Sequence, residues 1–141
     1  MKVRDSKYAQ CLYFTSAALA RKVEKLATQV WKAVDLPPSH AYLLMAVLEE
    51  PGMQPSALSA ELQLQPSTIT RLIEKLEEKK LVVRTTEGKI TNVYPTPKAK
   101  ELQSKMKECV RQFSQKYANL VGADESSRLV RDIARIADKL E

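Results

Sequence analysis

Residues 55–96, PSALSAELQLQPSTITRLIEKLEEKKLVVRTTEGKITNVYPT, decide the fold of this chain. Leu58 and Leu62 lie four residues apart, which is the spacing of one helix face, and Pro66 suits the first turn of a second helix, where its missing N–H is no loss. The inward stripe of that second helix is expected to consist of Ile69, Leu72, Ile73 and Leu76. The pattern predicts a short helix, a tight turn and a longer helix.

Two β-branched runs follow, at residues 81–84 and 90–94, and the residues between them include Gly88. This composition favours a β-hairpin whose tip spans residues 85–89. Helix, turn, helix and hairpin in this order form a winged helix-turn-helix, which presents one helix to the DNA major groove and the hairpin to the adjacent backbone or minor groove. We therefore expect a DNA-binding unit over residues 38–96.

Amphipathic helices are predicted on both sides of this unit. Apolar residues recur at helical spacing over residues 6–34, 97–118 and 126–141. The run HAYLLMAVLEE is strongly apolar and predicts a buried helix that Pro38 or Ser39 opens. The fold class is therefore mainly α with a small β-hairpin wing.

The flanking helices, residues 6–34 and 97–141, are long relative to a core of this size. Their apolar stripes must be covered, and a second copy of the chain is the simplest cover. We expect a single domain over residues 1–141 that forms a twofold dimer and displays two recognition helices.

Composition narrows the class of protein. Of the 141 residues, 44% are hydrophobic and 28% are charged, which argues against disorder. No apolar run approaches the roughly 20 residues needed to cross a bilayer, and the N-terminus lacks the apolar segment of a secretory signal. We expect a cytoplasmic protein without a membrane partner.

Positive charge is concentrated in the proposed reading unit. The chain carries a net charge of +6, and residues 66–100 contain eight basic and four acidic residues. The outward side of the second helix offers hydroxyls and cations, which can bond to phosphates or base edges. The same pattern also fits an ordinary solvated helix, so a winged-helix domain used for protein contacts remains the alternative.

Three runs, LSAEL at residues 58–62, PSTITRLIEKLE at 66–77 and KKLVVR at 79–84, resemble the signature of MarR-family transcriptional regulators. The resemblance extends through Thr96, and the flanking helices match in number, length and order. It implies a homodimeric repressor that leaves a pseudo-palindromic operator in double-stranded DNA when a small aromatic effector, a drug or an oxidant acts. The DNA contacts that it implies are Pro66, Ser67, Thr68, Thr70, Arg71 and Lys75 in the major groove, with Arg84 and Lys89 in the wing.

The chain departs from that family where glycines usually end the two helices of the pair, because it has Gln63 and Lys80 there. A non-glycine residue in a left-handed conformation costs roughly 1 kcal/mol or more, so we expect these turns to be built differently. The wing is expected to be short, with Lys89 in place of an arginine. Lysine lacks the planar guanidinium, so sequence preference should rest on the recognition helix.

Cys11 lies in a stretch that resembles the region of the peroxide-sensing cysteine in one branch of the family. A sensor needs donors or positive charge beside its thiolate, and the position one turn later, where that branch has tyrosine, is Thr15. Cys11 is therefore either a thiol redox sensor or a structural residue of a dimer helix. Cys109 lies on an apolar stripe and is expected in the core.

No phosphate loop, nucleophile motif or partnered carboxylate pair is evident, so we expect neither enzymatic activity nor a cofactor. His40 stands apart from other metal-binding residue types, so no metal site is expected. Trp31 and Tyr42 should either pack in the core or line a pocket for an aromatic effector.

Overall fold

The computed structural model describes all 141 residues and is helical apart from one hairpin. The elements in chain order are α1 (Leu12–Trp31), α2 (Pro38–Glu49), α3 (Pro55–Leu62), α4 (Pro66–Glu78), β1 (Val82–Glu87), β2 (Ile90–Pro95), α5 (Pro97–Val121) and α6 (Ala123–Lys139), with short 3-10 helices η1 (Val3–Asp5) and η2 (Lys32–Val34). The predicted fold class, mainly α with a β-hairpin wing, is confirmed. No helix combines the length and the apolar character needed to span a membrane.

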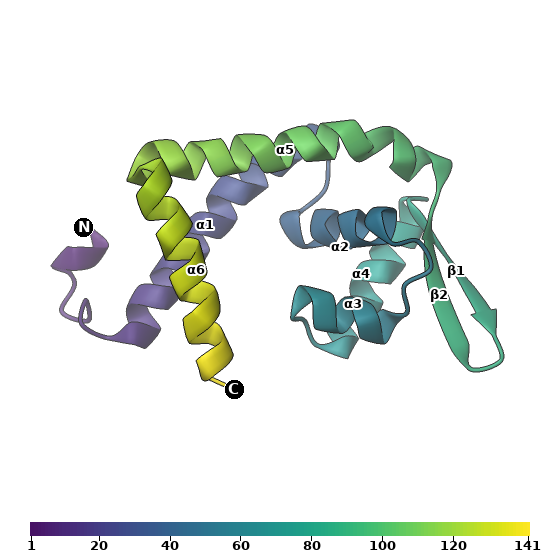
Figure 1. Cartoon of the computed structure of the whole chain (residues 1–141), viewed down its shortest axis with the longest axis horizontal. Coiled ribbons are helices and arrows are strands. Elements are labelled where there is room, and N and C mark those ends of the chain that lie inside the picture. The colour runs from purple at the N-terminus through teal and green to yellow at the C-terminus, as the bar shows by residue number, and fades with distance from the viewer.

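Helix α5 links the two ends of the molecule (Figure 1). It contacts α2 and β2 near its start and α1 and α6 further along. Helices α2 to α4 and the hairpin therefore lie together at one end of α5, while α6 and the first half of α1 lie at the other. This arrangement separates the winged-helix unit from the chain's two terminal helices.

The core joins the winged-helix unit to the second half of α1 and the first half of α5. Its 20 buried apolar residues begin at Ala27 in α1 and end at Cys109 in α5, and none comes from α6. Trp31, Leu43 and Leu44 are completely buried at its centre. The first half of α1 and the whole of α6 therefore have no core of their own to cover their apolar stripes.

Proline and threonine explain why several helices begin where they do. Helices α2, α3, α4 and α5 each start at a proline, at Pro38, Pro55, Pro66 and Pro97. Proline fits this position because its fixed φ suits a helix and the first N–H has no partner within it. Helix α5 also has a side-chain cap, since the Thr96 hydroxyl accepts a hydrogen bond from the Ala99 N–H.

The predicted first helix is wrong at its start, because α1 begins at Leu12 and not at residue 6. The Ser6 hydroxyl accepts the Tyr8 N–H at 3.1 Å, and turn-type backbone bonds join residues 6 to 11. Serine competes for backbone groups in this way and favours a turn over a helix. Cys11 is consequently the extended N-cap residue of α1.

The predicted tip of the wing, residues 85–89, is also wrong in its bounds. Residues 85–87, expected in the tip, continue β1, so each strand has six residues and pairs in antiparallel register from Val82↔Pro95 to Glu87↔Ile90. Only Gly88 and Lys89 form the turn, and Gly88 has a φ of 63°. Glycine accepts this left-handed conformation, which lets two residues reverse the chain.

The turns at Gln63 and Lys80 keep the left-handed conformation despite lacking glycine, so the expectation that they are built differently is wrong. Their φ angles are 54° and 62°. After α4, the Lys80 N–H donates to Glu77 O and the Leu81 N–H to Leu76 O, both at 2.9 Å, which is the Schellman pattern. After α3, the Gln63 amide side chain also donates to Ala60 O at 2.8 Å. These bonds and the buried Leu76 and Leu81 offset the strain.

Replacing the residue in the left-handed turn after α4 tests this strain. We expect Lys80→Gly to be more stable than Lys80→Ala by about 1 kcal/mol, because both remove the same charge while only alanine keeps the Cβ that is crowded at positive φ. Chemical denaturation of both variants at equal protein concentration measures the difference. Equal stability would contradict a strained Lys80.

Candidate nucleic-acid interface

Helix α4 divides its residues between the core and the surface as predicted. Ile69, Leu72, Ile73 and Leu76 are at most 7% exposed. On the other side, Ser67, Thr70, Arg71 and Lys75 are exposed, Pro66 is exposed at the first position, and Thr68 is half-buried. The structure therefore brings the six expected major-groove residues onto the outward side of one helix, close to the hairpin.

Arg71 is the cation on this surface that has no carboxylate partner. Its only side-chain contact is a long one, from Nη2 to Thr68 Oγ1 at 3.5 Å. Its remaining N–H donors are free to bind two acceptors at once, which is the geometry with which arginine binds guanine O6 and N7. The Thr70 hydroxyl donates to Pro66 O at 3.1 Å and keeps its acceptor capacity.

Lys75 has a loose partner. Its Nζ lies 3.6 Å from a Glu78 carboxylate oxygen, and both side chains are more than 60% exposed. An exposed pair of this kind contributes little and exchanges readily with other partners. Lys75 can therefore turn toward a phosphate at small cost.

The two wing residues lie in different environments. Lys89 is exposed in the turn of the hairpin. Arg84 is the third residue of β1, nearer the base of the hairpin, and its Nη2 is 2.7 Å from a carboxylate oxygen of Glu77 in α4. Glu77 was missed from the sequence, since an acidic residue in the last turn of a helix gives no signal that its partner lies seven residues later.

Two further lysines counted in the basic excess bind backbone oxygens. Lys79 Nζ donates to Asp35 O at 2.9 Å, and Lys98 Nζ donates to Lys79 O at 3.0 Å. Lys98 thereby satisfies a carbonyl at the end of α4, where a positive charge also complements the helix dipole. The number of cations free to meet DNA is thus smaller than the sequence suggests.

His40, in the first turn of α2, lies close to the C-terminal half of α4. Its Nδ1 is 3.3 Å from the Ser39 hydroxyl. Partial burial lowers the pKa of the imidazole below its ordinary value of 6.5, and the positive charges of Lys79 and Lys75 lower it further. The ring is therefore held neutral at pH values where a solvated histidine would begin to take up a proton.

The two cysteines differ in environment. Cys11 is exposed, and the Thr15 hydroxyl donates to the carbonyl oxygens of Cys11 and Leu12 rather than to the sulfur. Cys109 is buried, as predicted, and burial raises the pKa of its thiol, with the charge of Glu108 adding to the rise.

Trp31 is completely buried, and its indole N–H has no hydrogen-bond partner. Its ring lies edge-on to Tyr42, with centroids 5.9 Å apart, and Tyr42 is 42% exposed. Burial raises the pKa of the Tyr42 hydroxyl, and Tyr117 adds to the rise. Trp31 is thus a core residue, which is the first of the two alternatives expected from the sequence, core packing or an effector pocket.

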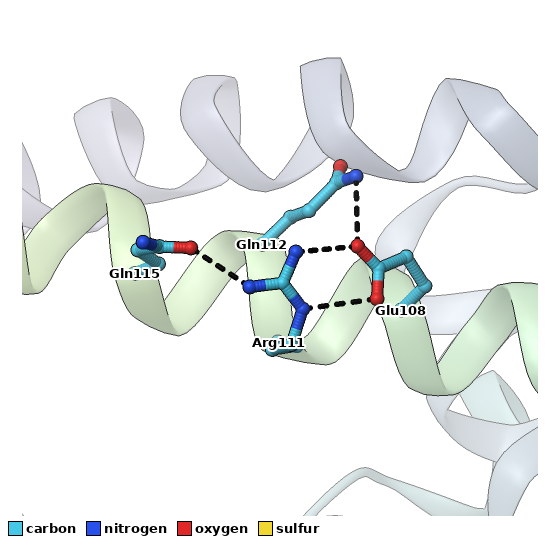
Figure 2. A network of polar contacts seen from close by, with 4 residues as sticks. All are labelled: Glu108, Arg111, Gln112 and Gln115. Carbon is cyan, nitrogen blue, oxygen red and sulfur yellow. Dashed lines mark hydrogen bonds and ion pairs between the residues drawn. The ribbon is translucent and has the colours of Figure 1, made fainter.

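Helix α5 carries an ordered polar network on its exposed side (Figure 2). The Arg111 guanidinium donates to both carboxylate oxygens of Glu108 and to Gln115 Oε1, and the Gln112 amide also donates to Glu108. The hydrogen bond from Arg111 is the main cause that lowers the pKa of Glu108. All four residues belong to α5, so the network supports this helix and joins no second element.

The order of elements and the outward face of α4 define a winged helix-turn-helix. Residues 34–89 match the sequence model of the MarR family. Comparison with curated protein sequences found no match.

Solved structures of MarR-type regulators share the complete fold. The repressor CouR, bound to a 23-mer DNA duplex, superposes with a TM-score of 0.84 at 19% identity and covers 97% of this chain and 98% of its own. PcaV from Streptomyces coelicolor, in complex with its natural ligand, gives 0.81 at 19% identity, with coverage of 96% and 98%. MepR of S. aureus, in a DNA complex, gives 0.80 at 16% identity, with coverage of 92% and 98%. At these identities the likeness establishes the fold.

The lowered pKa of His40 has a consequence for stability. As pH falls below 6.5, His40 takes up a proton in the unfolded chain before it does so in the folded chain. The free energy of unfolding therefore keeps its full His40 contribution above pH 6.5 and loses it as pH falls through the folded-state pKa. We expect His40→Gln to flatten the decrease between about pH 7 and pH 5.5. Denaturant unfolding of both proteins across this range measures it, and His40 is the chain's only histidine. Parallel pH profiles would contradict the assignment.

Proposed function

We propose that this protein is a homodimeric, sequence-specific DNA-binding transcriptional regulator, a repressor that binds a pseudo-palindromic operator. The observation that carries the proposal is the outward face of α4, where Arg71 has no carboxylate partner beside the hydroxyls of Ser67, Thr68 and Thr70. Such a face combines groups for phosphates with a guanidinium for a base edge. The DNA complexes of the similar proteins CouR and MepR support the same use of the fold.

A groove between α1 and α6 supports the dimer. It has a volume of about 350 Å³, and the residues lining it are Leu12, Thr15, Ser16, Leu19, Leu129, Ile133, Ile136, Ala137 and Leu140. Leu12 is 66% exposed and Leu140 is 73% exposed, although both are large and apolar. An apolar patch of this kind on a surface marks an interaction site.

The polar groups of the groove favour a protein helix over a small polar ligand as its occupant. The Thr15 and Ser16 hydroxyls donate to backbone carbonyls of their own helix. The remaining lining residues offer only hydrocarbon, which suits the matching apolar stripe of a second copy. Twofold pairing through α1 and α6 would leave both α4 faces free, as two half-sites require.

The release of DNA is proposed to follow from an effector that acts between the terminal helices and the winged-helix unit. CouR has also been solved with p-coumaroyl-CoA, and PcaV with its natural ligand, which supports a small-molecule effector for this fold. In this chain the half-exposed ring of Tyr42 in α2, which packs against the buried Trp31 of α1, offers an accessible aromatic surface to such an effector.

DNA binding is tested by fluorescence anisotropy with DNA from the region flanking the coding gene, at several salt concentrations. We expect Arg71→Ala to weaken specific binding by roughly 1 to 3 kcal/mol per half-site, because it removes a base contact. Lys89→Ala should weaken binding to all sequences equally and reduce the salt slope by about one for each lysine removed. Affinity weaker than about micromolar at low salt, without any salt dependence, would support the protein-contact alternative instead.

The dimer is tested by placing a charge in the groove. We expect Ile133→Glu to weaken association about 100- to 10,000-fold, because each of the two copies loses roughly 1.5 to 3 kcal/mol of apolar burial. Sedimentation equilibrium measures the dissociation constant. Arg131→Glu, an exposed position on the same helix outside the groove, is the control and should remain dimeric. A dimer that survives Ile133→Glu would exclude this groove as the interface.

A further inference from the structure

One ion pair connects the recognition helix to the wing. The structure contains four salt bridges, and three of them lie within a single helix, in α4, α5 and α6. The fourth joins Glu77 in the last turn of α4 to Arg84 in β1, with Nη2 2.7 Å from Oε1. It is therefore the only ion pair in the molecule that joins two elements.

The hairpin has few other anchors beyond its base. Val82 is the only buried residue of β1, and Val93 is the only buried residue of β2. A short backbone bridge between Met53 and Val93 ties β2 to the body. Past Val82, Arg84 is the only β1 residue whose side chain has a polar partner in another element, and the strands extend from there into solvent.

We propose that Arg84 is a positioning residue: its ion pair with Glu77 sets the angle of the wing relative to α4, and its guanidinium does not contact DNA. The two uses of Arg84 compete, because the Glu77 carboxylate holds Nη2 and offsets the positive charge that would attract a phosphate. A phosphate that took Arg84 would also leave Glu77 as an uncompensated negative charge near the DNA. This inference rests on the proposed DNA-binding function and replaces the family-derived expectation for Arg84.

A DNA-contacting Arg84 and a positioning Arg84 predict opposite changes in DNA affinity for Glu77→Gln. This substitution keeps the size of the side chain and removes a negative charge, which by itself favours binding to a polyanion. If Arg84 contacts DNA, Glu77→Gln frees it and affinity rises. If the pair positions the wing, affinity falls by about tenfold in spite of the favourable change in charge.

Salt dependence and a double substitution sharpen the test. The salt slope is compared in the Lys89→Ala background, where the wing's own lysine contact is already absent. There we expect Arg84→Gln to leave the salt slope unchanged, whereas loss of a phosphate contact by Arg84 would reduce that slope by about one per subunit. Glu77→Gln combined with Arg84→Gln should lose no more affinity than either change alone. The exchanged pair, Glu77→Arg with Arg84→Glu, should recover binding.

Glu78→Gln is the matched control. Glu78 lies on the same turn of α4, and its substitution also removes one negative charge, but its partner Lys75 belongs to the same helix. The DNA affinity of the Glu78→Gln variant should be unchanged or slightly raised, so a loss of affinity confined to Glu77→Gln reports on the wing. A rise in affinity with Glu77→Gln, or a salt slope that Arg84→Gln reduces further in the Lys89→Ala background, would overturn the proposal.

Hydrogen exchange in the absence of DNA tests the pair separately from the proposed function. We expect Glu77→Gln and Arg84→Gln to speed amide exchange of the β1 and β2 ladder severalfold, with α6 unaffected and Glu78→Gln like the unaltered protein. If the unaltered chain bound no DNA, the proposed function would fail while this measurement still decided whether the pair holds the wing. Unchanged exchange in both variants would show that it does not.

Discussion

The burial of one apolar stripe on α4 determines how the rest of the structure is arranged. Ile69, Leu72, Ile73 and Leu76 follow the helical repeat and are almost completely buried against α2, α3 and β1. Each such side chain contributes roughly 1.5 to 3 kcal/mol when it leaves water, so rotation of the helix about its axis would be strongly unfavourable. The opposite side, with Ser67 and Arg71, must then face outward. The orientation of the candidate reading surface is thus a consequence of core packing.

Much of the winged-helix unit could be predicted from the sequence, because its signals are local. A proline opens each of four helices, and periodic apolar residues mark their buried faces. The ends of elements were harder: a serine turn delays α1, and cross-strand pairing extends β1 into the expected tip. The turns at Gln63 and Lys80 show the same limit, because backbone bonds and buried leucines elsewhere stabilise a conformation that each residue alone disfavours.

The candidate site divides in a similar way. Which residues lie on the outward side of α4 follows from the period of the helix, and the structure places all six there. The partners of those residues do not follow from period, because they depend on how separate elements meet. Arg84 and Glu77 are seven residues apart and meet only because β1 turns back past the end of α4. Lys79 similarly reaches Asp35, which is distant in sequence, through the packing of α2 on α4.

These partners link the charge of the reading unit to the need for a dimer. Arg84 is held by Glu77, and Lys79 and Lys98 bind carbonyl oxygens, so one unit has fewer cations for phosphates than its composition suggests. Because phosphate contacts supply most of the non-specific affinity, a single unit should bind DNA weakly. Joining two units makes the second binding event intramolecular and raises the overall affinity without new contacts. The apolar groove between α1 and α6, at one end of α5, thus offers the dimer contact that the weakly charged reading unit at the other end needs for tight DNA binding.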